Sequence, residues 1–510
     1  MKEEKKAGLS IKNIFGKYHN ILAIVLACFY PCFFVFYANI EEIGLKGLSY
    51  IWEPVLMYLT IALVVYFISY VATKKVAKAS FITTFILTII CNFVMINKIF
   101  NFVFACDYKL QVIVMTIMIV LLIVIVKCTK LKIDYGMLCD IICFAIAFLV
   151  VTDCLMAGVK LCNKQDVKKS EVSITKTKES NRNIYYMILD EYSGEEGLEY
   201  YYGLDNSELY GFLEGVGCNV IRKTHNYEGL FTHEIVPNIL NLDYVTSISG
   251  VASKNVELTQ NAKLIEFFKD SGYSIKLVND EGFLKDDGCE VVGGKNYKKY
   301  SIDEKKNTQQ IIYGQSVISV LLLMFNKLEY TVEQKQEAAR EKEALFDSYF
   351  ENCGLSDEKK VLIGYFNIPH EPFLFEHDGT VTDDTNVGDW GDKEKYTEQL
   401  GYVNTQIKKI VEKIVKDDPD SIIVIQSDHG SRYAKDNMSK YKKKDYDEVK
   451  ETENMQNVIN VVYMGGENVD IQDGTSCINT WRTILNKEFG SNLDMIDCKK
   501  LIYHWKAMVD

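Results

Sequence analysis

Long apolar stretches dominate the first third of the chain. Five of them have the length and composition of membrane-spanning helices, which need about 20 mostly apolar residues. They cover residues 20–39, 51–71, 81–104, 111–126 and 135–159. So many long apolar stretches in series are not typical of buried core helices. We therefore expect a membrane domain of five transmembrane helices over residues 1–159, without a cleaved signal peptide, since no small-residue cleavage site follows the first stretch.

Lysines predict the orientation of these helices. Residues 1–19 hold five lysines, and the loops after the second and fourth stretches hold three each. The opposing short loops hold only Lys46 and Lys109. Because lysine-rich loops stay in the cytoplasm, we expect a multi-pass cell-membrane protein with a cytoplasmic N-terminus. Five crossings then place everything after residue 160 outside the cytoplasm, although four lysines lie between residues 160 and 169.

The pattern changes after residue 160. Residues 160–182 are polar and lysine-rich and are predicted to form a linker, and residues 183–510 alternate short apolar runs with amphipathic segments. We expect strands at residues 184–189, 219–222, 273–278, 361–366, 422–426 and 458–463, and helices at residues 195–202, 206–216, 232–240, 258–271, 309–352, 394–415 and 474–489. This alternation predicts an α/β domain with a mostly parallel, doubly wound sheet.

Two of the predicted strands end in side chains that bind metal ions. Six apolar residues, 184–189, lead directly into Asp190 and Glu191, and a β-branched run leads into Asp428 and His429. Active-site groups of such sheets lie just beyond the carboxyl ends of the strands. Zinc and manganese accept carboxylate and imidazole ligands together, whereas calcium does not favour imidazole. Gly430 would let the backbone turn sharply beside these ligands.

Two further stretches carry candidate chemistry. Thr232 lies where a loop enters a helix, so its hydroxyl is either an N-cap or a nucleophile beside the anion-binding end of the helix. The neighbouring His233 and Glu234 point in different directions on a helix and are left out of the predicted site. His370 follows a strand and stands between prolines, where it is either a turn residue or a proton donor to a reacting group.

Charge and cysteine content exclude several functions. The net charge of −12 gives no support for nucleic-acid binding. Five cysteines lie after residue 162, scattered and without a C-x-x-C pair, so a zinc ribbon is not expected. The sequence does not decide whether two of these five cysteines form a disulfide.

Taken in order, the four chemical stretches resemble the alkaline phosphatase superfamily. They are most similar to its membrane-anchored sulfatase-like branch, which includes lipoteichoic acid synthases and phosphoethanolamine transferases. The resemblance covers residues 183–510 and includes two further motifs, Tyr396-x-x-Gln-x-x-Tyr-Val-Asn404 and Asn479-Thr-Trp-Arg-x-Ile-Leu-Asn486. It implies an alkaline-phosphatase-like sheet domain behind a multi-span membrane domain.

The resemblance also implies a site. One divalent metal ion, manganese, zinc or magnesium, would be held by Asp190, Thr232, Asp428 and His429. Thr232 would be the nucleophile, and His370 and Arg432 would bind the transferred group. Glu191 matches a second acid of sulfatases and is an additional candidate. No C/S-x-P-x-R motif surrounds residue 232, which argues against a true sulfatase, and Tyr365 stands where relatives carry a histidine, which argues against a second metal.

The function that these residues predict is a metal-dependent transferase outside the cytoplasm. It would move a phospho-alcohol such as phosphoglycerol or phosphoethanolamine from a membrane phospholipid to a surface glycan or lipid, through a phosphothreonine intermediate. One alternative is a membrane-anchored hydrolase of phosphoric or sulfuric esters. The other is an inactive relative that binds or scaffolds.

Overall fold

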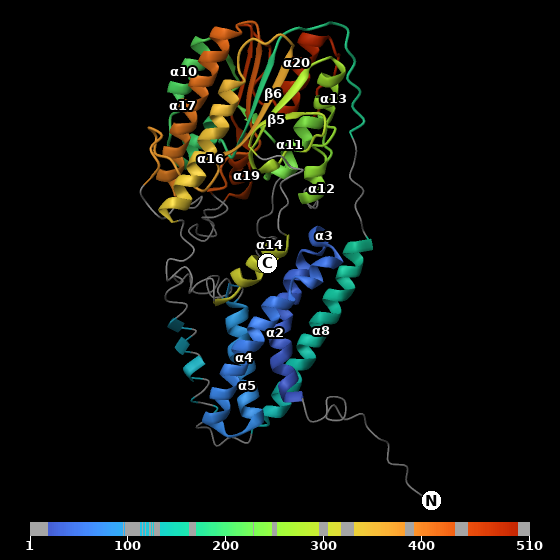
Figure 1. Ribbon diagram of the computed structural model, residues 1–510, viewed down its shortest axis with the longest axis vertical. Helices are drawn as coiled ribbons and strands as arrows, with labels where there is room; N and C mark the ends of the chain where they lie inside the picture. The colour runs from blue at the N-terminus through green and yellow to red at the C-terminus, as the bar shows by residue number, and fades with distance from the viewer. Residues whose placement is uncertain are drawn as a thin grey trace, which may run out of the picture. The chain divides into compact units, whose positions relative to one another are not determined.

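A computed structural model describes most of the chain (Figure 1). It covers residues 19–94, 96, 133–162, 170–227, 229–246, 252–294, 304–317, 331–382, 392–433 and 447–497, with scattered positions between 113 and 126. The chain divides into two compact units. One comprises Met1–Lys164 with Ile302–Leu328, and the other Gln165–Ser301 with Glu329–Asp510. We refer to them as the membrane unit and the catalytic unit.

Apolar helices build the membrane unit. Its described helices are α2 (His19–Ala38), α3 (Ile40–Ile43), η2 (Leu45–Ser49), α4 (Trp52–Thr73), α5 (Val76–Cys91), α8 (Tyr135–Cys162) and α14 (Glu304–Gly314). Within the described residues, three helices are long and apolar enough to cross a membrane: Asn20–Ala38, Leu45–Thr73 and Tyr135–Cys162. The shorter α5 overlaps the third predicted span, and the fourth is described only at scattered positions.

Contacts inside the membrane unit show which helix ends lie together. At one end of the unit, Val94 lies beside the end of α14, because the Val94 N–H donates to the Gln315 carbonyl at 3.1 Å. The start of α4 lies at the same end, since Gln309 Nε2 donates to the Tyr50 carbonyl at 3.2 Å. At the other end, Lys78 Nζ donates to the Val126 carbonyl at 2.6 Å. Val94 and Val126 therefore lie at opposite ends of this unit. The count of five spans stays a prediction.

A seven-stranded sheet forms the centre of the catalytic unit. Across the sheet the strands are β2 (Asn219–Val220), β9 (Asn460–Met464), β7 (Ile422–Ser427), β1 (Ile184–Asp190), β6 (Lys360–Pro369), β4 (Ser274–Asn279) and β5 (Glu290–Gly294). Neighbours are parallel except where β9 pairs with β7 and with β2. A small antiparallel pair, β3 (Thr224–His225) and β8 (Asn457–Val458), lies apart from it. The predicted fold class is confirmed.

Helices cover both faces of this sheet (Figure 1). The central strand β1 is buried throughout, and its alternate side chains enter two different hydrophobic cores. The core around Tyr185 and Met187 is covered by α9 (Glu195–Tyr202), α10 (Ser207–Gly215), α16 (Val332–Glu351) and α17 (Lys393–Asp417). The core around Tyr186 and Ile188 is covered by α11 (Thr232–Asn241), α13 (Lys263–Asp270) and α20 (Cys477–Phe489). Shorter elements are α12 (Ala252–Glu257), η3 (Asp280–Gly282) and α19 (Glu448–Gln456).

The long helical region predicted over residues 309–352 is not continuous. Among its described residues are two helices, α14 and α16, which belong to different units. Glycine is a poor helix former, and α14 ends at Gly314. Helix α16 begins at Val332, and its N-cap is Thr331, whose side chain accepts from the Gln334 N–H while the Gln334 side chain accepts from the Thr331 N–H.

Part of the predicted linker packs on the catalytic unit. The Thr175 hydroxyl donates to the Ser491 carbonyl at 2.9 Å, and the Thr177 N–H donates to the Phe489 carbonyl at 3.0 Å. Ser170 is tied in the same way to Asn241 at the end of α11. Residues 170–182 therefore belong to the catalytic unit.

Candidate metal centre

The sheet brings two acids together at its carboxyl edge. β1 and β7 are parallel neighbours, and Leu189 pairs with Ser427 in their register. Asp190 and Asp428 follow these two positions directly, so they emerge side by side at the same edge. This is the edge at which open α/β sheets hold their ligands.

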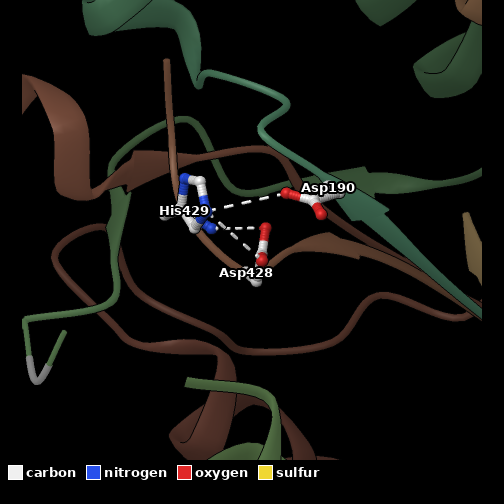
Figure 2. Close-up of side chains that lie close together, drawn as sticks. All are labelled: Asp190, Asp428 and His429. Atoms are coloured by element: carbon white, nitrogen blue, oxygen red, sulfur yellow. Dashed lines mark hydrogen bonds and ion pairs between the residues drawn. The ribbon is translucent and has the colours of Figure 1, made fainter. Parts of the chain in front are cut away.

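His429 completes a compact group with the two acids (Figure 2). One ligand atom of each of the three side chains lies within 4.8 Å of the others. His429 Nε2 is 3.6 Å from Asp190 Oδ1 and 3.5 Å from Asp428 Oδ2. All three side chains are buried. Hence the structure joins three of the four residues predicted to hold a metal at one point.

The remaining hydrogen bonds leave one oxygen of each acid for a cation. Asp428 Oδ1 accepts from the backbone N–H groups of His429 at 2.7 Å and Glu191 at 3.2 Å. Asp190 Oδ2 accepts from the Tyr365 hydroxyl at 2.8 Å. The other two oxygens, Asp190 Oδ1 and Asp428 Oδ2, are buried and have no hydrogen-bond partner within the described part of the chain. Buried carboxylate oxygens are costly without a partner, so a divalent cation fits between them.

The protonation of His429 suits a metal ligand. Its Nδ1 lies 2.9 Å from the Gly430 carbonyl, and we assign the proton to this nitrogen because the carbonyl can only accept. Burial lowers the pKa of His429 to about 4, which keeps the ring neutral. The lone pair of Nε2 then faces the two acids. A ring nitrogen held in this way by a backbone carbonyl is the usual arrangement of metal-binding histidines.

The two acids are poorly stabilised as anions on their own. Burial raises the pKa of Asp190, and the nearby charge of Asp428 raises it further. Burial likewise raises the pKa of Asp428. A cation at their shared point would offset both effects, as expected for residues that bind a metal.

Thr232 points its hydroxyl at this group and does not cap its helix. The N-cap of α11 is Phe231, and Thr232 is the first helical residue, without a side-chain capping bond. Its hydroxyl instead lies 3.3 Å from Asp190 Oδ2, to which it donates. The N-cap alternative is therefore wrong. Helix start and side-chain direction place the hydroxyl beside the three metal-type ligands.

His370 and Arg432 lie together beside the acids. Arg432 Nη2 is 3.1 Å from His370 Nε2, and His370 Nδ1 is 2.6 Å from the Glu371 carbonyl. Burial lowers the pKa of His370, but the charges of Asp190 and Glu191 raise it more, so that its net shift is upward. The hydrogen bond with Arg432 favours a neutral ring instead, because a guanidinium can donate only to an unprotonated ring nitrogen. We therefore assign the neutral tautomer, in which Nδ1 donates to the Glu371 carbonyl and Nε2 accepts from Arg432.

The Glu191 carboxylate contacts these two residues. Its Oε1 accepts from the Arg432 backbone N–H at 2.7 Å, and its Oε2 is 4.0 Å from His370 Nε2. The backbone of Glu191 has a positive φ of 67°, which is uncommon for a residue other than glycine. Burial raises the pKa of Glu191 to about 7, although His370 and Arg432 lower it. Glu191 is thus placed to support Arg432.

Sequence reasoning missed the residues that position the site. Asn226 donates through Nδ2 to the Asp428 carbonyl at 2.7 Å. Gln399 donates through Nε2 to the His370 carbonyl at 3.0 Å, and the Tyr396 hydroxyl donates to the Glu191 carbonyl at 2.9 Å. Tyr396 and Gln399 stand in a motif that supported only the family resemblance. Their spacing of three places them on one face of α17, which was the signal available.

Gly430 is required for a different reason from the one predicted. It is absent from the described residues with positive φ, so the turn itself does not demand glycine. A Cβ atom at this position would lie 2.6 Å from the Asn457 carbonyl oxygen and 3.0 Å from that of Asn454. Close approach of the backbone at residues 454–457 therefore selects glycine.

The fold is an α/β domain with a candidate metal site at the carboxyl edge of its sheet. The family model described as Sulfatase matches residues 196–494, more than half of the chain. The chain belongs to the sulfatase family, within the alkaline phosphatase superfamily, as the motifs predicted. None of the curated proteins matches it.

Solved structures of both transferases and hydrolases are similar to the chain. The integral membrane lipooligosaccharide phosphoethanolamine transferase A of Neisseria meningitidis has 14% identity and a TM-score of 0.39, covering 92% of this chain and 95% of its own. The periplasmic domain of EptC from Escherichia coli, in complex with Zn, has 13% identity, a TM-score of 0.38 and coverage of 63% and 86%. A phosphonate monoester hydrolase of Agrobacterium radiobacter has 11% identity, a TM-score of 0.36 and coverage of 61% and 74%. These neighbours are distant, and the family assignment rests on the Sulfatase model.

Proposed function

We propose that the protein is a membrane-anchored phosphotransferase that uses Thr232 as its nucleophile. It would transfer a phosphoglycerol or phosphoethanolamine group from a phospholipid to a surface glycan or lipid. The observation that carries this proposal is the Thr232 hydroxyl, 3.3 Å from Asp190 Oδ2 in a group of metal-type ligands. A complete set of this kind also argues against an inactive scaffold.

The reaction proceeds in two displacements. In the first, the Thr232 oxygen would attack the phosphorus of the lipid, and the bond from phosphorus to the diacylglycerol oxygen would break. The Thr232 hydroxyl loses one proton in this step and the diacylglycerol oxygen gains one. In the second, an acceptor hydroxyl would lose its proton and attack the phosphorus of the phosphothreonine, and the bond from phosphorus to the Thr232 oxygen would break, so that this oxygen regains a proton. Asp190, Asp428, His429 and Thr232 would hold a zinc, manganese or magnesium ion, whose positive charge would lower the hydroxyl pKa and neutralise phosphoryl oxygens.

His370 and Arg432 would hold the transferred group. The guanidinium carbon of Arg432 lies 5.6 Å from the centre of the Phe231 ring, and Phe231 directly precedes Thr232 in the chain. The same guanidinium group contacts His370. A guanidinium binds phosphoryl oxygens through several N–H groups, and the N-terminus of α11 adds its own favourable dipole. Once protonated at Nε2, His370 would donate to the departing oxygen or protonate it.

Labelled phospholipids test the proposal against its hydrolase alternative. The purified full chain is incubated with phospholipids that carry labelled head groups, with and without candidate glycans. We expect diacylglycerol release together with label on the glycan. Release of the free head group alone, with glycan present, would replace the transferase by a hydrolase, and release of neither product from any lipid would contradict both.

The proposed surface acceptor requires the catalytic unit to lie outside the cytoplasm. A reporter fused after Asp510 should then be active only if it works outside the cytoplasm, because five spans and a cytoplasmic N-terminus leave the C-terminus there. A matched fusion within residues 127–132, on the predicted cytoplasmic side, should show the opposite behaviour. Activity of a cytoplasm-only reporter after Asp510 would overturn this topology.

A further inference from the structure

One helix encoded within the catalytic half of the chain belongs to the membrane unit. The chain leaves the catalytic unit after β5, which ends at Gly294, and returns to it at α16, which begins at Val332. Between these points, Ile302–Leu328 groups with Met1–Lys164 (Figure 1). The described part of this segment is α14 with the three residues that follow it. Its packing can therefore be followed side chain by side chain.

Polar side chains fix the first half of α14 to the start of α4. Lys305 Nζ lies 2.6 Å from Glu53 Oε1, and Gln309 Nε2 donates to Glu53 Oε2 at 2.9 Å. Gln309 also donates to the Tyr50 carbonyl. Lys305 and Gln309 are four residues apart and share one face of α14, so a single face makes these contacts.

Apolar packing fixes the second half. Ile312 is only 1% exposed and lies in one hydrophobic cluster with Ile51, Val55 and Tyr58. The fully buried Tyr58 hydroxyl donates to the Ile312 carbonyl at 3.3 Å. A buried tyrosine hydroxyl needs such a partner. The core of the membrane unit is thus completed by a residue that lies far along the chain.

We propose that α14 is a second membrane anchor, which holds the catalytic half of the chain to the membrane unit independently of the linker at residues 163–169. The sequence supports an anchor, because residues 317–325 read V-I-S-V-L-L-L-M-F and only one of these nine residues is polar. The inference rests on the contacts of α14 and does not require the proposed reaction. It predicts that the catalytic half stays on the membrane after the linker is cut.

The test is a cut in the full-length protein. Residues 163–169 are replaced by a specific protease site, and a tag follows Asp510. Membrane vesicles that expose the tag are treated with the protease and washed with high salt. We expect the fragment that begins near residue 170 to sediment with the membranes. Its quantitative appearance in the supernatant would overturn the proposal.

Three variants of the cut protein identify the cause of retention. Replacing residues 302–328 by a Gly/Ser segment of equal length should release the fragment, and retention in that variant would assign the binding to another surface and overturn the proposal. Ile312→Asp should release most of it, because a buried apolar contact becomes a charge. Gln310→Asp places the same charge on an exposed position of α14 and should leave retention unchanged. Each variant must remain in the membrane before the cut, which shows that its membrane unit is inserted.

Discussion

Thr232→Ala is expected to fold, insert into the membrane and lose turnover by several orders of magnitude. The hydroxyl donates to Asp190 and makes no capping bond, so its removal should cost about 1 kcal/mol of stability. A nucleophile that also binds the metal cannot be replaced by a methyl group, and the chemical step then loses its acceptor for the phosphoryl group. The rate of head-group transfer and the melting temperature, measured on the same sample, separate these two effects.

Two other variants serve as controls. Thr232→Ser keeps the hydroxyl and should retain part of the activity. Thr483→Ala removes a hydroxyl that donates to the Asn479 carbonyl on α20, and it should turn over at a near-normal rate. Rapid acid quench of the wild type with lipid donor should trap a phosphorylated peptide that contains Thr232. Near-normal turnover of Thr232→Ala would show that the nucleophile has been assigned wrongly.

The parts of the site that end strands could be predicted from sequence. Residues 184–189 and 422–425 are continuous apolar runs, which are typical of strands buried on both faces. The first run stops at Asp190 and the second leads through two polar residues to Asp428, and parallel strands bring such ends to one edge. Asp190, Asp428 and His429 meet for this reason. The prediction that these residues meet did not require knowing that β1 pairs with β7.

The parts that depend on backbone direction could not be predicted. The start of α11 decides whether Thr232 caps or points at Asp190, and sequence patterns locate helix ends only to within about two residues. Glu191 follows Asp190 directly, but its backbone has a positive φ and its carboxylate contacts Arg432 and His370. The pattern of apolar and polar positions does not predict this backbone conformation.

The helical region predicted over residues 309–352 shows a second limit of prediction from sequence. Its described helices α14 and α16 both have helical composition, so periodicity did not separate them. They differ in their packing partners, because α14 packs on membrane helices and α16 packs on the sheet. Tertiary contacts of this kind are not visible in local sequence.

Asp428→Asn is expected to abolish tight metal binding while the fold survives. The amide oxygen can take the place of Oδ1 and accept from the His429 and Glu191 N–H groups. The amide NH₂ then takes the place of Oδ2, which lies 3.5 Å from His429 Nε2. It would donate to that nitrogen and occupy the lone pair that binds the metal. One charged ligand is lost and a second ligand is blocked.

The same substitution gives a readout that does not depend on activity. Removing one of two buried like charges relieves their repulsion, so the metal-free variant should melt at or above the temperature of metal-free wild type. Zinc or manganese should raise the melting temperature of wild type, by mass action, and leave that of Asp428→Asn unchanged. Asp418→Asn is the matched control, since Asp418 is a buried acid that accepts from Asn183 and Tyr185. It should bind metal as wild type does. Full metal content together with full activity in Asp428→Asn would remove Asp428 from the site.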